Sequence, residues 1–354
     1  MYKPNLIVVA WLRKSAGMFL AILTVVSVNT TSLQAQGNPS STSVPNALPK
    51  NTVIATIDAG SYPWSVIVSP DNRTLYVVDS GSNQVSVIDA APDYAVKATI
   101  SVGNGPEFAA ITPDGKTLYV TNTTDSTVSV ISTASNMVID TIKGDGAYGI
   151  AVTPNGEEAF VASYGSGSVM AIETATNQVS TITVPGQPFL VAFSPNGKQA
   201  YVPNYAGGNF ISIIDVATKT VSKNVIGGGE ISSPVSIAVA PDGATLYVSD
   251  YYNYVAAIAA DGALKKATLI VPAAEVAGQY LPGQAVLTPN GKYLYVANYN
   301  SNNVVMLSAS ENKVLGKSIP TGDGPYYAAV APNGKHLYVA NYLDNTVTVI
   351  DVAP

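Results

Sequence analysis

The side chains in this chain that could take part in chemistry are carboxylates. Seven of them lie in or beside the segments between predicted strands: Glu107, Asp145, Glu230, Glu275 and Asp323 in loops, and Asp79 and Asp250 at strand ends. Two or three such groups, if they converge, could bind a calcium ion through oxygen ligands or act as a hydrolytic acid–base pair. The alternative is that they are separate and solvated. We therefore expect no cofactor, and calcium is the one ion that these residues would suit.

Composition argues against other kinds of catalytic site. The chain has no cysteine and one histidine, His336, which precedes a predicted strand at a position that is mostly polar in the other repeats. We expect His336 to be a solvated surface residue. A Ser-His-Asp or Cys-His arrangement and a His-ligated zinc or copper site then cannot be assembled.

Aromatic residues are the second group of candidates. The residue after the proline, or its equivalent, that opens each repeat reads Trp64, Glu107, Tyr148, Phe189, Val235, Gly283 and Tyr326. The residue after the second strand is tyrosine in five repeats: Tyr164, Tyr205, Tyr251, Tyr299 and Tyr342. Aromatic rings among Asn, Asp and Ser suit a carbohydrate or a polypeptide ligand. For the repeated tyrosines, packing between neighbouring repeats is the alternative.

The longest loop, residues 271–282, is expected to lie over the mouth of the channel that the repeats surround. A second longer loop, residues 227–233, is its neighbour. We assign no catalytic residue and no metal ligand. The candidate ligand-binding residues are Trp64, Glu107, Tyr148, Phe189, Tyr251, Glu275, Tyr280, Tyr326 and Tyr327.

A sevenfold repeat must position these residues. Each unit contains a Pro-Asp/Asn-Gly turn (Asn72 replaces the glycine in the first unit), a Leu-Tyr-Val-type run and a Val-x-Val-Ile-type run. The turn prolines are 41 to 48 residues apart, at Pro70, Pro113, Pro154, Pro195, Pro241, Pro289 and Pro332. A period near 40 with four short strands (A to D) per unit predicts a propeller blade. The predicted fold is all-β, a seven-bladed β-propeller of four-stranded antiparallel blades over residues 52–354.

Three details of the blades follow from the repeat. Strand B ends in Asp79, Asn122, Ser163, Asn204, Asp250, Asn298 and Asn341, which we expect to cap backbone amides of the next loop. Pro203 inside a strand B predicts a local defect of the ladder in the fourth blade. The chain ends on a strand C, so residues 52–58 are predicted to supply the outer strand of the last blade and close the ring.

The second-strand motif carries a family resemblance. Residues 119–122 read Tyr-Val-Thr-Asn, and the variants begin at Tyr76, Phe160, Tyr201, Tyr247, Tyr295 and Tyr338. The chain resembles the YVTN family of β-propeller repeats, whose members are exported or cell-surface modules. Seven-bladed lactonases are the nearest enzymatic relatives that this resemblance suggests. As a family they use Arg and His near the channel, and we expect neither there in this chain.

The start of the chain resembles a secretory signal. Residues 1–35 combine Lys3, Arg13 and Lys14 with a short apolar stretch and a small-residue exit, and residues 36–51 form a Pro/Ser/Asn linker. An uncleaved anchor is the alternative. Without the signal the chain has 14 basic and 23 acidic residues, a net charge of −9. This balance argues against nucleic acid and anionic membranes as partners.

The sequence therefore favours a secreted, periplasmic or cell-surface protein, monomeric, with no membrane span in the mature chain. Its predicted function is non-catalytic binding of a glycan, peptide or protein partner at the aromatic loop face. The alternative is a lactonase-like hydrolase that uses Glu107 and Glu275. A third hypothesis is an accessory subunit that docks a redox partner.

Overall fold

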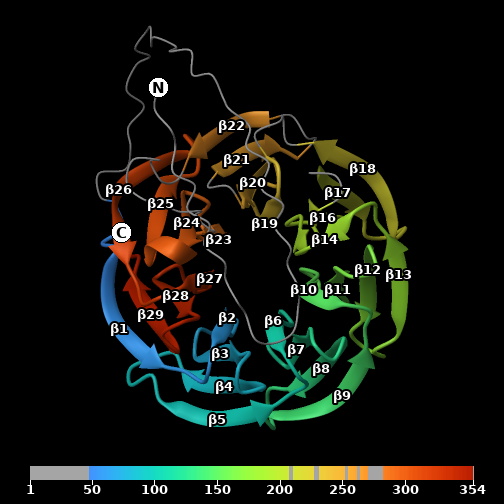
Figure 1. Ribbon diagram of the computed structural model, residues 1–354, viewed down its shortest axis with the longest axis horizontal. Helices are drawn as coiled ribbons and strands as arrows, with labels where there is room; N and C mark the ends of the chain where they lie inside the picture. The colour runs from blue at the N-terminus through green and yellow to red at the C-terminus, as the bar shows by residue number, and fades with distance from the viewer. Residues whose placement is uncertain are drawn as a thin grey trace, which may run out of the picture. The chain divides into compact units, whose positions relative to one another are not determined.

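The computed structural model describes residues 48–206, 210–226, 231–251, 254–260, 264–269 and 282–353. The predicted signal peptide, and the predicted linker up to residue 47, lie outside these residues. The described chain forms seven antiparallel sheets, one per repeat, arranged around a common centre (Figure 1). The predicted all-β propeller of seven blades is confirmed.

Each blade contributes one strand to each of four concentric layers. The innermost strands, A, are β2 (Pro63–Val68), β6 (Pro106–Ile111), β10 (Ala147–Val152), β14 (Gln187–Pro188) with β15 (Ala192–Phe193), β19 (Pro234–Val239), β23 (Pro282–Leu287) and β27 (Pro325–Val330). Strands B are β3 (Thr74–Asp79), β7 (Thr117–Asn122), β11 (Glu158–Ser163), β16 (Gln199–Ala206), β20 (Thr245–Asp250), β24 (Tyr293–Asn298) and β28 (His336–Asn341).

The two outer layers follow the same order. Strands C are β4 (Gln84–Asp89), β8 (Thr127–Ser132), β12 (Ser168–Glu173), β17 (Phe210–Asp215), β21 (Tyr254–Ala259), β25 (Asn303–Ser308) and β29 (Thr346–Asp351). Strands D are β5 (Val96–Ser101), β9 (Met137–Lys143), β13 (Val179–Thr183), β18 (Thr220–Ile226), β22 (Leu264–Leu269), β26 (Lys313–Pro320) and β1 (Thr52–Asp58). A 3₁₀ turn, η1 (Tyr299–Ser301), follows β24.

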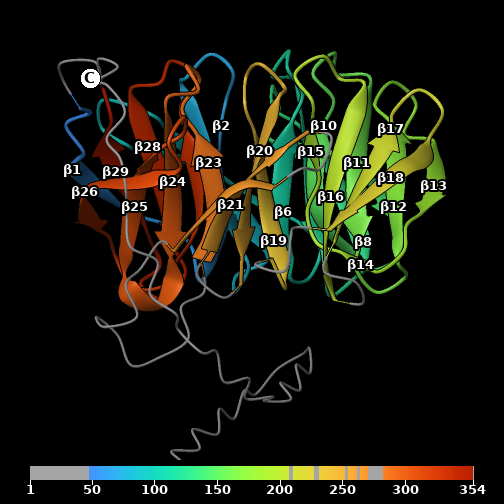
Figure 2. The same ribbon diagram turned by 90° about the horizontal axis from the view of Figure 1, so that it is seen from above.

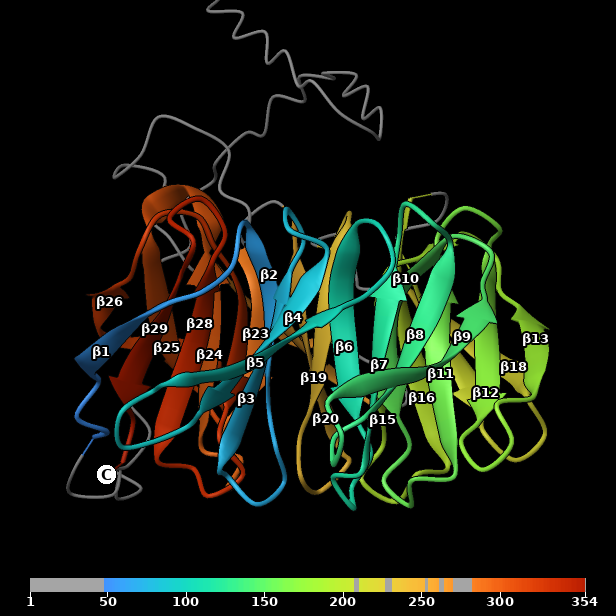
Figure 3. The ribbon, with the colours of Figure 1, turned by 90° about the horizontal axis from the view of Figure 1, so that it is seen from below.

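The inner and outer strands of a blade run in different directions because each sheet is twisted. Inner strands such as β19 and β23 run along the channel (Figure 2), whereas the outer strands β5 and β9 cross the blades obliquely (Figure 3). This is the right-handed twist of β-strands accumulated over four neighbours. Because every blade has the same order of strands, the starts of all strands A, where the candidate residues lie, face the same mouth of the channel.

The core lies between the blades. The described residues form seven hydrophobic clusters, and each cluster joins two neighbouring blades. Strand B of each blade is nearly all buried, and Tyr119, Tyr201, Tyr295 and Tyr338 are among its largest buried side chains. Burying one large apolar side chain contributes about 1.5–3 kcal/mol. Each blade therefore depends on both neighbours for its stability.

The ends of the propeller meet in one sheet. Strand β1 pairs antiparallel with β29, from Thr52 opposite Asp351 to Asp58 opposite Thr346. A second link lies at the A–B turns, where the Asn333 amide donates to Asn72 Oδ1 at 2.9 Å. Asn72 is the residue that replaces the turn glycine of the other blades, and it keeps their positive φ, at 62°. It thus connects the first blade to the seventh.

Pro203 interrupts the inner strand of the fourth blade, as predicted. The five-stranded sheet there contains two short pieces, β14 and β15, in place of one strand A. Pro203 has no N–H to donate to its inner neighbour, and only its carbonyl accepts a bond, from the Phe189 amide at 2.9 Å. The ladder resumes at Ala192, opposite Tyr201.

The buried ends of strands B differ from the prediction in their partners. Asn122, Asn204 and Asn341 donate to hydroxyls on strand C, namely Ser129 at 2.9 Å, Ser212 at 3.1 Å and Thr348 at 2.8 Å. Asp250 accepts the amides of Ser232 and Ser233, which precede strand A. The prediction that they cap the next loop was wrong, because strand C and the D–A loop are closer. Their structural role holds.

Candidate functional site

A β-bulge between strands A and B marks the candidate ring residue in six of the seven blades. In the first, second, fifth and seventh blades the register between strands A and B shifts across one residue, which is Trp64, Glu107, Val235 or Tyr326. In the third and sixth blades the shift spans Tyr148 with Gly149 and Gly283 with Gln284. A bulge leaves one residue unpaired and turns its side chain, which is common beside functional sites. We call these residues, with Phe189 of the fourth blade, the channel ring.

Aromatic side chains fill most of the channel ring. Trp64 and Tyr326 have ring centroids 4.8 Å apart, and Tyr148 and Phe189 have theirs 4.6 Å apart. Phe108, one residue past the ring, connects the two pairs, at 6.3 Å from Trp64 and 4.9 Å from Tyr148. The aromatic set therefore forms one continuous cluster over five blades, from the seventh through the first to the fourth. The three other ring residues are Glu107, Val235 and Gly283, and the last two leave the fifth and sixth blades less filled.

The tyrosines of the B–C loops extend this cluster outward. Tyr342 lies 5.3 Å from Trp64, Tyr205 lies 5.7 Å from Phe189, and Tyr205 and Tyr251 are 5.7 Å apart. Tyr164 and Tyr299 contact Tyr148 and Tyr326, each at 6.1 Å. Tyr164, Tyr205, Tyr299 and Tyr342 thus contact the channel ring, and all five tyrosines leave part of their surface exposed.

Glu107 is the acidic member of the channel ring. Its Oε2 atom is buried and has no hydrogen-bond partner, and the same holds for Trp64 Nε1. Burial raises the pKa of Glu107 to about 8, while the nearby hydroxyls of Tyr148 and Thr123 act in the opposite direction. Ser65 Oγ donates to the Glu107 carbonyl at 2.8 Å and fixes the backbone from the first blade. The carboxyl is therefore largely neutral at pH 7.

The phenols around Glu107 stay protonated. Burial, followed by the charge of Glu107, raises the pKa of Tyr148 well above its usual value. The same two causes raise the pKa of Tyr326, and burial raises that of Tyr327. The Tyr148 hydroxyl interacts with both the Glu107 carboxyl and the Tyr326 hydroxyl. A hydroxyl chain thus crosses the channel from the second to the seventh blade.

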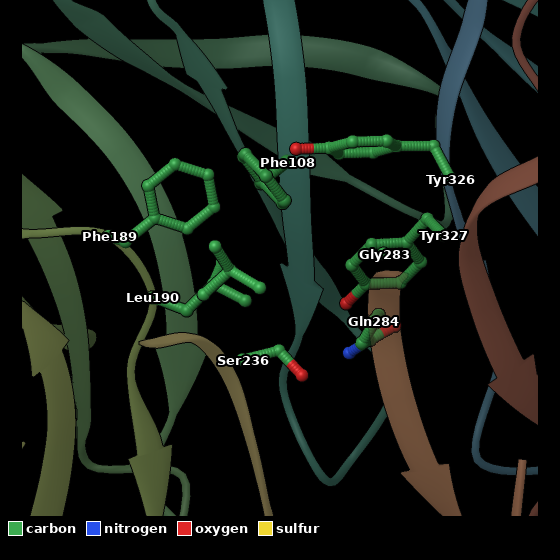
Figure 4. Close-up of a pocket in the computed structure, with 9 residues that line it drawn as sticks. Phe108, Phe189, Leu190, Ser236, Gly283, Gln284, Tyr326 and Tyr327 are labelled. Atoms are coloured by element: carbon green, nitrogen blue, oxygen red, sulfur yellow. The ribbon is translucent and has the colours of Figure 1, made fainter. Parts of the chain in front are cut away.

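A narrow cavity adjoins this cluster on the less filled side. Its volume is about 10 Å³, which is room for about one water molecule. Tyr326 and Tyr327 face Phe108, Phe189 and Leu190 across it, with Ser236 and Gln284 between them (Figure 4). Gln284 Oε1 is a further buried atom without a partner. The cavity is thus a narrow crevice between aromatic walls, with Gln284 among its polar side chains.

The remaining candidates lie elsewhere or outside the description. Glu230, Glu275 and Tyr280 fall outside the described residues, so their convergence with Glu107 stays a prediction. Asp145 and Asp323 are exposed. His336 is at the opposite end of β28 from Asn341, which pairs with Pro325 beside the ring. Arg73 follows an A–B turn on that same far rim.

Sequence reasoning missed Phe108, Thr123, Leu190 and Gln284. Phe108, Leu190 and Gln284 follow the channel ring in the sequence, and Thr123 follows a strand B. Their signal was available in the aligned repeats: the position after the ring reads Ser65, Phe108, Gly149, Leu190, Ser236, Gln284 and Tyr327, which is as irregular as the ring itself. Irregularity at a second aligned position marks a second layer of the channel.

Comparison with known families bears on this site. The family described as "Lactonase, 7-bladed beta-propeller" matches residues 7–139 and 171–354, which is most of the chain. The chain belongs to this lactonase family. The specific likeness to YVTN repeats remains a resemblance of motifs. No match was found among curated proteins.

A solved structure is similar to this lactonase-family propeller over most of its length. It is described as hydrazine synthase of Kuenenia stuttgartiensis, with a TM-score of 0.75 and 25% sequence identity. The match covers 90% of this chain and 99% of that one. The likeness therefore extends to the whole propeller and is not limited to a few blades.

No helix in the described residues is long and apolar enough to cross a membrane. No group of three or more His, Cys, Asp or Glu side chains there is arranged to hold a metal ion. The calcium hypothesis thus gains no ligand set from the described part of the chain.

Proposed function

We propose that this member of the lactonase family is a secreted or periplasmic binding protein that holds a carbohydrate at the channel mouth without catalysis. The observation that carries the proposal is the continuous aromatic cluster, from Tyr342 through Trp64 and Phe108 to Phe189 and Tyr205. Partly exposed rings at a concave mouth offer flat apolar faces to sugar rings. Secretion rests on the signal-like residues 1–35.

The polar groups of the mouth support the same proposal. Trp64 Nε1, Glu107 Oε2 and Gln284 Oε1 are buried atoms without partners. Leaving a buried polar atom unpaired costs about 1–3 kcal/mol. A ligand with hydroxyl or amino groups would satisfy these atoms while its ring stacks on the aromatic side chains. Such a combination gives both affinity and orientation.

A lactonase-like hydrolysis is the second candidate, and two observations favour it. The family match covers most of the chain, and Glu107, with its pKa raised to about 8, could donate a proton near neutral pH. Against it, the one histidine, and the one arginine outside the predicted signal peptide, lie on the far rim. A lactone substrate would also need a group that activates water, and Glu107 alone supplies a single carboxyl.

Glycan-array binding tests the proposal. We expect wild type to bind, and Trp64→Ala combined with Tyr326→Ala to lose at least 90% of the signal, because the stacking surface is removed. Tyr94→Ala is the matched control, since it removes a partly buried tyrosine from a C–D turn on the far rim. Absence of binding to any glycan would overturn the carbohydrate proposal. Hydrolysis of a panel of lactones that is lost in Glu107→Gln would establish the second candidate instead.

A further inference from the structure

The Glu107 carboxyl has no cationic partner in the described part of the chain. Ion pairs there join Lys50, Lys97, Lys116 and Lys219 to Asp351, Asp89, Asp114 and Glu158. Neither a lysine nor an arginine contributes to the electrostatic surroundings of Glu107, which are burial and two hydroxyls. An acidic group with a buried oxygen and no cationic partner has a strongly perturbed pKa, and such groups gather at functional sites.

The groups around Glu107 are unsuited to a lone carboxylate. The neighbouring ring residues are Trp64 on β2 and Tyr148 on β10, and Tyr326 reaches Tyr148 across the channel. The face of an aromatic ring carries partial negative charge, so it repels an anion and attracts a cation. A carboxylate together with a cation would be favourable in this enclosure. The enclosure therefore favours a ligand with positive charge.

An alkylammonium group matches this chemistry better than a metal ion does. Its N–H or N–CH₃ groups contact aromatic faces, whereas a calcium ion needs six or more oxygen ligands. Among the described residues no group of three or more His, Cys, Asp or Glu side chains could hold a metal ion. The net charge of the chain, −6, also favours the approach of cations.

We propose that the channel mouth binds an alkylammonium group, with Glu107 as its counter-ion and the rings of Trp64, Tyr148 and Tyr326 as its walls. The inference rests on the proposed function and names its ligand class: a carbohydrate that carries free amino groups, such as an oligomer of glucosamine. The B–C loop tyrosines, Tyr205, Tyr251, Tyr299 and Tyr342, supply stacking surface for the sugar rings beside the amine.

Binding of a cation must shift the protonation of Glu107. The pKa of about 8 in the free protein means that the carboxyl is mostly protonated at pH 7. A permanent cation binds the ionised form, so its binding at pH 7 releases a proton and tightens as the pH rises from 6 to about 8. The titratable groups that face Glu107 are the phenols of Tyr148 and Tyr326, whose pKa values are raised. They stay neutral through this range.

Choline and its carbon isostere, 3,3-dimethylbutan-1-ol, separate the effect of the ligand's charge from the effect of its shape. The two probes share size and shape, and only choline is cationic. Titration calorimetry of the wild-type protein should show choline binding at least tenfold more tightly at pH 8 than the isostere. Choline should also bind about fiftyfold more tightly at pH 8 than at pH 6, because the ionised fraction of Glu107 rises by that factor. Equal affinity for the two probes would overturn the inference, and this comparison needs no variant.

Variants then locate the site. Glu107→Gln keeps the shape of the side chain, and we expect it to reduce choline binding at least tenfold and to abolish the pH dependence. Tyr94→Ala should change neither. Circular dichroism and thermal unfolding verify that each variant folds. Undiminished choline binding by folded Glu107→Gln would place the cation elsewhere and refute the assignment.

A pair of tetrasaccharides separates this inference from the proposed function. Tetraglucosamine carries free amines, whereas its N-acetylated form has the same sugar rings without the charge. We expect the free-amine form to bind at least tenfold more tightly. Equal binding of both would refute the ammonium inference and leave the carbohydrate function standing. Selective choline binding with no binding of either sugar would support the cation site and refute the carbohydrate function.

Discussion

Two acidic residues of this propeller, the buried Asp79 and the half-buried Glu107, have raised pKa values for the same main cause. Burial raises the pKa of Asp79 to about 6, while the Ser86 hydroxyl, which donates at 2.6 Å, acts in the opposite direction. Burial raises that of Glu107 to about 8. Asp79 occupies a position that is asparagine in four other blades, so its charge has no role in building the blade. Glu107 has no such equivalent.

Asp79→Asn should stabilise the protein at neutral pH. The raised pKa means that the folded state binds the Asp79 proton more tightly than the unfolded state, so wild type loses stability as the pH rises from about 4 to 6. Asparagine avoids this loss, and its amide can donate to Ser86 as Asn122 donates to Ser129. A shift from 3.8 to about 6 corresponds to about 3 kcal/mol as an upper figure.

Urea unfolding at pH 4 and pH 7 measures this effect. The free energy of unfolding of Asp79→Asn should exceed that of wild type at pH 7, and the difference should be smaller at pH 4. Asp250→Asn is the matched comparison, because the Asp250 carboxylate already accepts two backbone amides, and it should bring no gain. An equal increase in the free energy of unfolding at both pH values would show that the ionisation of Asp79 is not the cause.

The sequence predicted the residues of the mouth better than their chemistry. Trp64, Tyr148 and Tyr326 could be placed around a channel because aligned repeats share a register. The isolation of Glu107 could not be predicted, because Thr123, Tyr148 and Tyr326 come from three different blades. Burial and unpaired atoms depend on distances between blades, and spacing within one blade carries no information about them.

At the scale of elements, the bulge at the start of strand A distinguishes the channel from the rest of the blade. Strands and hairpins could be predicted because alternation and Pro-Asp-Gly turns are local. The bulge could not, since it exists only relative to the partner strand B. The incorrect partners expected for Asn122 and Asn341 have the same origin. Where a polar side chain has several neighbours, the sequence alone does not select among them.

Gly283→Ala should destabilise the sixth blade. A Cβ at Gly283 would collide with the carbonyl oxygen of Tyr326 on the neighbouring inner strand. Relief of the collision would move β23 away from β27, and we expect a loss of about 1–3 kcal/mol, typical of overpacking. Urea unfolding measures it. Gly165→Ala is the control, since nothing lies within 4 Å of its Cβ position. Equal stability of the two variants would contradict this explanation.

At the scale of the whole propeller, stability depends on closure. Seven hydrophobic clusters lie between neighbouring blades, and the seventh blade shares one with the first blade and one with the sixth. Loss of a strand from that blade therefore weakens its packing against both neighbours. Period and strand count predicted this architecture almost completely, because each blade repeats the same local pattern. The link between Asn72 and Asn333 could not be predicted, since it joins residues 261 positions apart.

Removal of residues 52–58 should lower the Tm by about 10 °C or more, because the edge of β29 and Ile57's place in the core are lost together. The exposed edge should also promote dimers. Differential scanning calorimetry and size-exclusion chromatography measure both effects, with a chain that starts at residue 48 as the control. An unchanged Tm would mean that β1 contributes little to the ring.

The pairing of β1 with β29 also sets a sequence of events during synthesis. A ribosome releases β1 first and β29 last, with the other blades between them. Until the final strand emerges, Ile57, which is 5% exposed in the finished ring, remains accessible to water and to other chains. Contacts between such distant segments form slowly. The newborn chain should therefore need protection from aggregation over nearly its entire length, and closure should be the slowest step of its folding.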